Sequence, residues 1–98
     1  MKSDAIRKAS ALPTGTTLQG YTLLEAVGQT ATSIVYLARH ELLDVVAYVH
    51  EFFAPEHMKR DSATGAWTIL PGHETEAMQA LQTFVNDMRL VSGMHQSV

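Results

Sequence analysis

The stretch that decides the fold is VVAYVHEFFAP, which occupies residues 45–55. Branched and aromatic side chains dominate residues 45–53, and this composition predicts a β-strand. The apolar run at 45–49 is almost unbroken, which predicts that the strand is buried on both faces. Pro55 cannot donate a hydrogen bond to a neighbouring strand, so we expect the strand to end before it.

Two further strands are predicted on the N-terminal side of this stretch. Residues 21–27 read YTLLEAV and residues 33–38 read SIVYLA, and both segments are rich in residues that favour strands. Residues 28–32 between them predict a turn, so the two strands should form an antiparallel hairpin. Residues 40–44 predict a second connection, which leads into the strand at 45–53.

The clearest helix of the chain is predicted in its last segment, where apolar residues recur at spacings of three and four. Glu74 and Glu76 lie in its first turn and Arg89 near its end, and both signs of charge suit the helix dipole. Gly93 is a natural stop. The apolar stripe is expected to pack on the sheet, and it comprises Ala77, Ala80, Leu81, Phe84, Met88 and Val91, with Met78 and Val85 widening it.

The segment between the third strand and the helix is largely polar. Residues 55–65 leave room for one short helical turn, and residues 66–70 predict a short extra strand closed by Pro71 and Gly72. The expected order is three strands, a short strand and a long helix. This order predicts an α+β fold in which an antiparallel sheet of three main strands and a short one packs against one long C-terminal helix.

Length and composition narrow the possible functions. The chain has 98 residues, which suits one domain at residues 13–98, and residues 1–12 are expected to form a flexible leader. The net charge is −3 and the seven basic residues are scattered, so nucleic-acid binding is not expected. The sequence has no cysteine, no stretch long enough to cross a membrane and no signal peptide at its charged start. We expect a cytoplasmic protein.

The first two predicted strands resemble part of a known protein family. Residues 18–28 read LQGYTLLEAVG and residues 35–39 read VYLAR. Together they resemble the first two strands of the N-terminal lobe of protein kinases, in which a glycine-rich hairpin precedes a strand that bears a lysine.

The rest of the chain extends this resemblance to a group of bacterial, eukaryotic-like Ser/Thr protein kinases, over roughly residues 12–98. HEFFAP at residues 50–55 resembles the group's Lys-Glu-Tyr/Phe-Phe-Pro. The group then has an arginine, a small strand and a proline before its helix, and Arg60, residues 67–69 and Pro71 follow that order. LQTFVNDMR at residues 81–89 resembles the group's Leu-x-x-Phe-x-x-Glu-Ala-Arg. The resemblance implies a kinase N-lobe-like fold.

The loop that covers the nucleotide phosphates in this family departs from its pattern, Gly-x-Gly-x-x-Gly-x-Val. Residues 28–35 read GQTATSIV, so Gly28 matches the first glycine and Thr30 and Ser33 replace the other two. Glycine permits positive φ and lets the backbone approach phosphate oxygens, whereas a Cβ makes both costly. We expect an ordinary β-turn here, although the hydroxyl groups could still donate hydrogen bonds to a ligand.

The lysine that holds the phosphates in the family is also absent. His50 takes its place, and an imidazole with a pKa near 6.5 is mostly neutral at pH 7. An alignment shifted by one residue puts Val49 there, so neither alignment supplies a lysine. Tyr48 lies on the same strand face as His50, where the family has a small alanine above the adenine, and its ring would fill much of that space. Asp87 matches the helix glutamate that pairs with the lysine, and it either contacts His50 or lies in solvent on the polar face.

The resemblance therefore implies a degenerate, pseudokinase-like lobe that is not an enzyme and holds no cofactor. We expect a regulatory module that binds another protein, such as a kinase or a signalling or secretion component, or that forms a homodimer. The candidate interaction residues are Met78, Val85, Met88, Val91 and Met94, because methionine suits an adaptable surface.

Two other hypotheses stay open from the sequence. The chain could bind a nucleotide or another small ligand in the degraded cleft, with Tyr48 and His50 lining it, or it could be one part of a split kinase. The five histidines show no pair at metal-binding helical spacing, so no metal site is expected.

Overall fold

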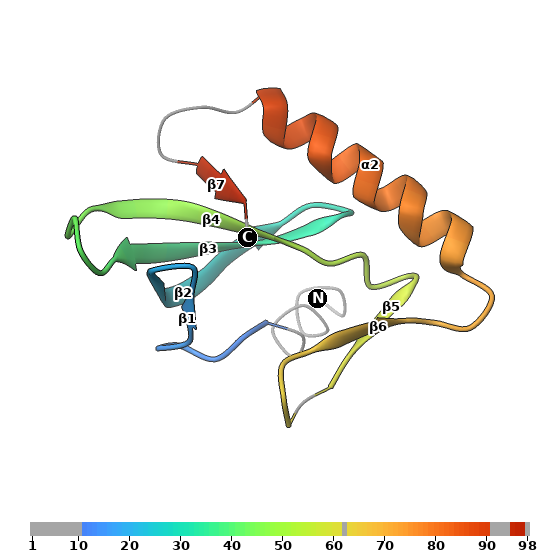
Figure 1. Ribbon diagram of the computed structural model, residues 1–98, viewed down its shortest axis with the longest axis horizontal. Helices are drawn as coiled ribbons and strands as arrows, with labels where there is room; N and C mark the ends of the chain where they lie inside the picture. Colours follow the sequence, from blue (N-terminus) through green and yellow to red (C-terminus); the bar gives the residue numbers. More distant parts are fainter. Residues whose placement is uncertain (1–10, 62, 91–94, 98) are drawn as a thin grey trace.

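The computed structural model describes residues 11–61, 63–90 and 95–97, and it contains a curled antiparallel sheet packed against one C-terminal helix. The predicted α+β class is confirmed. Figure 1 shows the helix along one side of the sheet, with a small hairpin beyond the end of the central strands. The elements are β1 (Thr17–Leu18), β2 (Tyr21–Gln29), β3 (Ser33–His40), β4 (Val46–Phe52), β5 (Met58–Arg60), β6 (Trp67–Ile69), α2 (Glu74–Leu90) and β7 (His95–Ser97).

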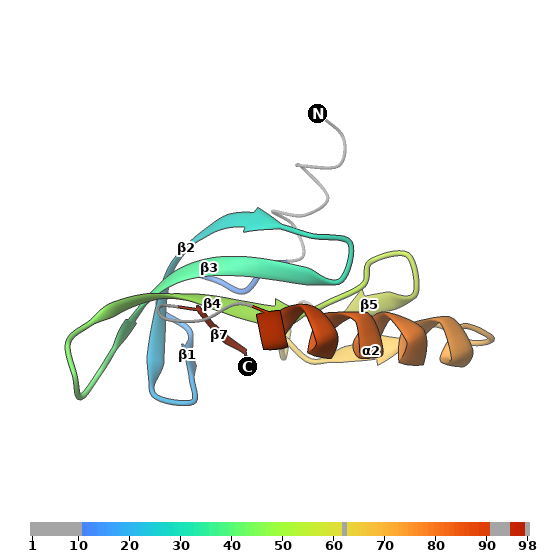
Figure 2. The ribbon, with the colours of Figure 1, turned by 90° about the horizontal axis from the view of Figure 1, so that it is seen from above.

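The main sheet has five strands in the order β1-β2-β3-β4-β7. Strands β1 to β4 are antiparallel neighbours, whereas β7 returns after the helix and pairs with β4 in parallel. The register of β2 against β3 shifts between Leu23 and Glu25 and again between Ala26 and Gly28. Such irregularities bend a strand and increase its twist, which accounts for the way β2 and β3 arch to one side in Figure 2.

The strands on either side of residues 28–32 agree with the predicted hairpin, and β3 and β4 are joined through the predicted connection at 40–44. Three short strands were not predicted. One of them, β1, pairs with β2 through a turn at Gln19 and Gly20, which both have positive φ. A turn with two positive φ values suits the right-handed twist of a hairpin, which explains the glycine.

The described residues of 55–65 form turns and a strand in place of the short helical turn for which the sequence left room. Met58–Arg60 form β5, which pairs with β6 to make a separate two-stranded sheet. Asp61 ends β5, and its carboxylate accepts hydrogen bonds from the amides of Ala63 and Thr64. This local turn returns the chain toward β6 and explains why a hairpin forms here.

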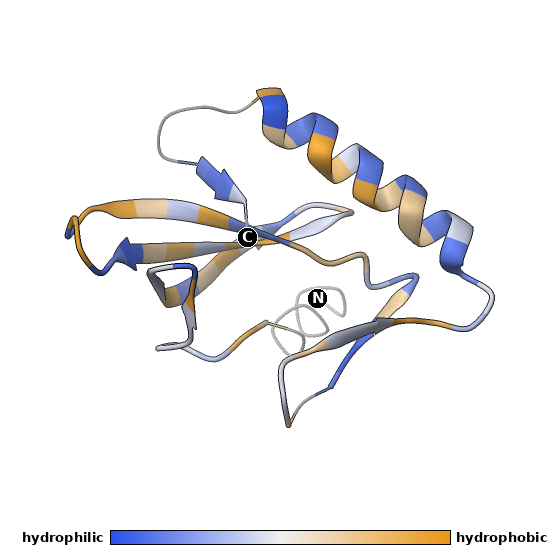
Figure 3. Ribbon diagram, viewed as in Figure 1, coloured by the Kyte–Doolittle hydropathy of each residue, from blue (hydrophilic) through white to orange (hydrophobic). Residues whose placement is uncertain are grey.

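The core lies between the inner face of the main sheet, the β5–β6 hairpin and α2. Tyr36, Leu23 and Val49 are its largest fully buried side chains, and Ala77 and Phe84 are the buried residues of the helix. Phe84 contacts the ring of Phe52 on β4, with the ring centroids 5.6 Å apart. Figure 3 shows the corresponding alternation of hydrophobic and hydrophilic residues along α2.

The prediction that residues 45–49 are buried on both faces was wrong. Ala47 and Val49 are buried, but Tyr48 between them is exposed, and so is Val45. Tyr48 lies on the opposite face of β4, where its ring stacks on His95 of the neighbouring strand β7 and still remains exposed. The strand is therefore half-buried despite its apolar composition.

The predicted boundary at residue 13 also needs correction. Ala11 and Leu12 belong to the predicted leader, yet both pack against the hydrophobic core. The Leu12 amide also donates a hydrogen bond to the Tyr36 hydroxyl. The remaining leader residues, 1–10, lie outside the described part of the chain.

Candidate functional site

The loop at residues 28–33 closes on itself, as expected of an ordinary turn. The Thr30 amide donates to the Ser33 carbonyl at 2.9 Å, and the hydroxyls of the same two residues are hydrogen-bonded at 2.8 Å. The Thr30 hydroxyl oxygen also accepts a hydrogen bond from the Thr32 amide. Thr32 and Ser33 are buried, and the Thr32 carbonyl accepts from the Phe53 amide. The hydroxyl groups that could have met a ligand therefore bind the loop itself.

His50, which the sequence resemblance aligns with the lysine of protein kinases, contacts another histidine. Its Nε2 lies 2.8 Å from Nδ1 of His95 on β7, and the two rings are hydrogen-bonded. The ring of Tyr48 stacks on His95 with centroids 5.2 Å apart. Burial lowers the pKa of His50, and the nearby His95 ring lowers it further. Because this places His50 still further from the charged state at pH 7, it supplies no permanent cation.

The structure brings some of the predicted cleft residues together and leaves one apart. Gly28 pairs with Val35 across the sheet, and Val35 pairs with His50, so these residues lie in one row of three strands. Asp87 is exposed on α2, and no hydrogen bond or ion pair joins it to His50 among the described residues. Of the two alternatives for Asp87, the solvated acid is the one that the structure contains.

A buried polar cluster lies on the opposite face of β4 and was not predicted. The Arg60 guanidinium donates two hydrogen bonds to the Glu51 carboxylate, at 2.6 and 2.8 Å, and a third to the Gly65 carbonyl. The Tyr36 hydroxyl donates to the same carboxylate at 2.8 Å. Burial raises the pKa of Tyr36, and the negative charge of Glu51 adds to the effect. The cluster links β3, β4 and β5.

The alternation of β4 could have revealed this cluster. Glu51 is two residues from Val49 and therefore shares its buried face, where a carboxylate requires a partner. Arg60 was noted only for its place in the family order. The sequence gives no direct sign that Tyr36 completes the cluster.

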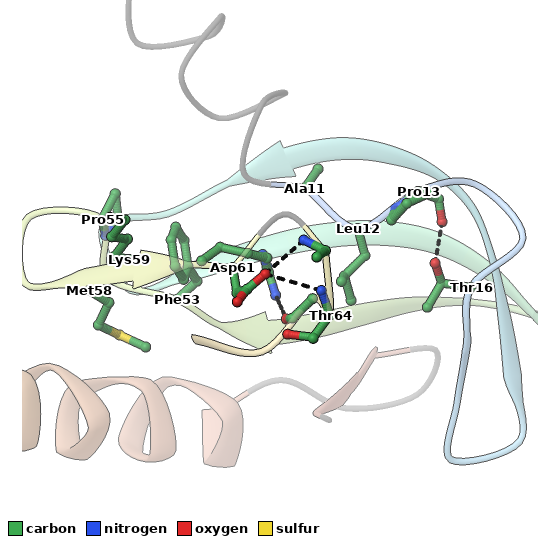
Figure 4. Close-up of a pocket in the computed structure, with 13 residues that line it drawn as sticks. Ala11, Leu12, Pro13, Thr16, Phe53, Pro55, Met58, Lys59, Asp61 and Thr64 are labelled. Atoms are coloured by element: carbon green, nitrogen blue, oxygen red, sulfur yellow. Dashed lines mark hydrogen bonds between the residues drawn. The ribbon is translucent and has the colours of Figure 1, made fainter. Parts of the chain in front are cut away.

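A cavity of about 640 Å³ lies between the N-terminal segment and the β5–β6 hairpin. Figure 4 shows Leu12 and Pro13 on one side and Phe53, Met58 and Lys59 on the other, with Asp61 and Thr64 between them. The lining is apolar at Leu12, Phe53 and Met58 and charged at Lys59 and Asp61. Neither Tyr48 nor His50 contributes to it, so this cavity is separate from the predicted cleft.

The predicted interaction residues differ in their availability. Met78 is 60% exposed and lines a shallow hollow on α2 with Glu74, Gln79 and Gln82. Val85 and Met88 are half-buried and pack against the core, because they lie on the inner side of the helix. Val91 and Met94 lie outside the described residues.

A second pair of histidines also meets in the fold. Nδ1 of His57, between β4 and β5, lies 3.0 Å from Nδ1 of His73, just before α2. Within residues 11–61, 63–90 and 95–97, no three His, Asp or Glu side chains are arranged to hold a metal ion together. In the same part of the chain, no helix is long and apolar enough to cross a membrane.

Comparison with known proteins supports the fold. The apo form of PpkA-294, from the bacterial Ser/Thr kinase PpkA, superposes with a TM-score of 0.70 over 83% of this chain at 24% sequence identity. This chain spans 29% of the length of that structure. No protein-family model matches the sequence, and no curated protein is significantly similar to it. The similarity shows a kinase-like fold, in agreement with the expected N-lobe architecture.

Proposed function

We propose that this chain is a kinase-derived, non-catalytic module in the cytoplasm that acts by binding another protein or a second copy of itself. The observation that carries the proposal is the environment of His50. In the family this place holds a permanently charged lysine, whereas here a largely neutral imidazole is hydrogen-bonded to His95 at 2.8 Å. A ring held in this way offers no ammonium to a nucleotide phosphate.

The loop at Thr30–Ser33 supports the same proposal. Catalytic phosphoryl transfer depends on positioning and electrostatic stabilisation of the phosphates by backbone amides and cations. The Thr30 and Thr32 amides are already hydrogen-bonded within the turn. A phosphate would have to displace these bonds and approach past two side chains that replace glycine.

The candidate docking surface is the outward side of α2. Met78 is exposed beside Gln79 and Gln82, and an exposed methionine in a polar surround can adapt to a partner side chain. Val85 and Met88 contribute indirectly, because they hold the helix against the core. A partner such as a kinase or a signalling or secretion component, or a second copy of the chain, would cover Met78.

The experiment combines the mass of the purified protein in solution with capture of partners from the native cell by the tagged chain. We expect a dimer or a partner in defined stoichiometry, and Met78→Glu should abolish that contact. Thr83→Glu is the matched control, because it adds the same charge at an exposed place on the same helix that does not line the hollow of Met78. A monomer without a partner, or equal behaviour of both variants, would overturn the proposed surface.

The competing hypotheses, a nucleotide sensor and one part of a split kinase, are tested by thermal unfolding with Mg·ATP. A ligand at a hundred times its dissociation constant stabilises a protein by about 2.7 kcal/mol. Our proposal expects no shift at millimolar Mg·ATP. A shift, or phosphate transfer after addition of a separate larger lobe, would replace the non-catalytic proposal with one of these two.

A further inference from the structure

His57 and His73 are the second histidine pair of the fold, and their contact is unusual in joining identical ring atoms. The two Nδ1 atoms lie 3.0 Å apart and the ring centroids 5.3 Å apart. One Nδ1 must carry the proton and the other a lone pair, so two nitrogens that can each ligate a metal lie side by side. The residues are sixteen apart in sequence, which is why no helical spacing revealed them.

The backbone fixes both residues in place. The His57 amide donates to the Ala54 carbonyl at 2.9 Å, and the His57 carbonyl accepts from the Leu70 amide at 2.9 Å. The His73 amide in turn donates to the Leu70 carbonyl at 3.0 Å, and the Ala77 amide donates to the His73 carbonyl at 2.9 Å. Leu70 therefore ties the two histidines to each other, and Ala77 ties His73 to the first turn of α2. Such a rigid support preorganises a site.

The separation of the two nitrogens suits a tetrahedral zinc ion. Zinc binds imidazole nitrogen at 2.0–2.1 Å, and a tetrahedral angle then separates two ligand nitrogens by about 3.3 Å. The observed separation of 3.0 Å is close to that value, and both rings would turn from each other toward the ion. Imidazole is also the ligand that suits zinc, copper and nickel rather than calcium or magnesium.

The surrounding charges are negative. His57 lines a hollow of about 260 Å³ together with Glu56 and Glu76. Glu74 and Glu76 occupy the first turn of α2. A cation at the start of a helix is opposed by the helix dipole, and these carboxylates offset that effect.

We propose that His57 and His73 form a two-histidine binding site for Zn²⁺, completed by water. With only two fixed protein ligands, the site binds more weakly than a four-ligand structural zinc site. The bound ion would join the β4–β5 connection to the start of α2 and thereby stabilise the fold. This proposal is independent of the proposed partner-binding role.

The test is a Zn²⁺ titration of the full chain with isotope-labelled histidine, followed by NMR. The ring signals of His57 and His73 should shift together and saturate, and the shifts should weaken at pH values at which imidazole is protonated. At a hundred times the dissociation constant, the unfolding equilibrium constant should fall about 100-fold. His57→Ala and His73→Ala should each abolish the stabilisation.

Two further variants distinguish this pair from the other histidines. His40→Ala is the matched control, because His40 is a single histidine whose Nδ1 accepts from the amides of Leu42 and Leu43. It should leave zinc binding unchanged. If His50→Ala abolishes binding, the ion belongs to the other pair and the proposal fails. It also fails if neither the His57 nor the His73 signal of the unaltered chain responds to millimolar Zn²⁺, a result that does not depend on any variant folding.

Discussion

Arg60 and Glu51 form a buried ion pair held at two points, with the guanidinium nitrogens 2.6 and 2.8 Å from the carboxylate oxygens. Their side chains are only 7% and 10% exposed. The pair joins the small β5–β6 hairpin to β4 of the main sheet, and the Arg60 guanidinium also lies over the Phe53 ring at 5.0 Å. The second sheet is thus attached to the first by charge as well as by apolar contact.

Removing one member of this pair should be strongly destabilising. Arg60→Ala leaves the Glu51 carboxylate buried without its cation, and such a loss costs about 3–5 kcal/mol. Urea unfolding measures the change. Arg39→Ala is the matched control, because the Arg39–Asp44 pair has the same 2.8 Å contact but side chains that are 52% and 76% exposed. It should cost about 0–1 kcal/mol. Equal costs for the two variants would contradict a structural role for the buried pair.

Because Tyr36 is buried, we expect the free energy of unfolding to decrease at high pH. Burial raises the pKa of Tyr36 above its ordinary value of about 10, and the negative charge of Glu51 raises it further. The hydrogen bond from the Leu12 amide and the positive charge of Arg60 lower the pKa, but the net shift is upward. The folded state therefore favours the neutral phenol. The resulting stability is fully present below pH 10 and should decline as the pH rises through the folded-state pKa.

Urea unfolding between pH 9 and pH 11 measures the beginning of this loss, and Tyr36→Phe should flatten the profile. The variant also removes a hydroxyl that donates to Glu51 and accepts from Leu12, so it should cost about 1–3 kcal/mol near pH 7. Tyr21→Phe is the control for the alkaline profile. An unchanged profile in Tyr36→Phe would show that another group titrates.

Whether a helix or strand could be predicted from the sequence depends on its length and on whether it forms only beside a partner strand. Strands β2 to β4 and helix α2 span seven to seventeen residues, so their periodicity is legible in the sequence. Strands β1, β5 and β7 have two or three residues, and their existence depends on a partner. β7 pairs with β4 across more than 40 residues, and no local pattern specifies such a contact.

In the candidate site, too, features set by local sequence could be predicted, and contacts made by a distant strand could not. The resemblance places His50 where kinases have a lysine, which follows from residue identity alone. The turn at Thr30–Ser33 was also expected from residue identity, and the structure contains it. The actual partner of His50 could not be predicted, because β7 brings His95 to a place where the family resemblance pointed to Asp87. The burial of Val85 and Met88, in contrast, was implicit in their helical spacing.

The position of His50 predicts an acid-induced loss of stability. Burial lowers the pKa of His50, and His95 contributes in the same direction. A lowered pKa means that the folded state disfavours the protonated ring. Its contribution is therefore present above the ordinary pKa of about 6.5 and should be lost as the pH falls through the lower folded-state pKa. NMR titration of the His50 ring and urea unfolding over this range measure the two quantities. If the NMR titration gave His50 no lowered pKa, that result would contradict the half-buried contact between His50 and His95.

The packing of α2 predicts a contrast between two large apolar residues of the same helix. Phe84 is buried against Phe52, so Phe84→Ala should cost about 3–5 kcal/mol. Met78 is exposed, so Met78→Ala should change stability by no more than about 0.5 kcal/mol. Thermal or urea unfolding distinguishes the two. A large cost for Met78→Ala would mean that its side chain is covered, either by a second copy or by a different packing of the helix.

The combined variant Tyr48→Ala and His50→Lys tests whether the cleft of this kinase-like fold can accept a nucleotide. It introduces the alanine and lysine that protein kinases have, yet we expect no thermal shift with millimolar Mg·ATP. The turn at Thr30–Ser33 keeps its amides hydrogen-bonded, and the new lysine would lie beside the His95 ring on β7. Adding Thr30→Gly and Ser33→Gly separates the two obstacles, because it removes the side chains and the hydroxyl contact of the loop. ATP binding by the first variant would show that residues 48 and 50 alone had closed the cleft. Binding only after the glycine changes would assign the loss to the loop.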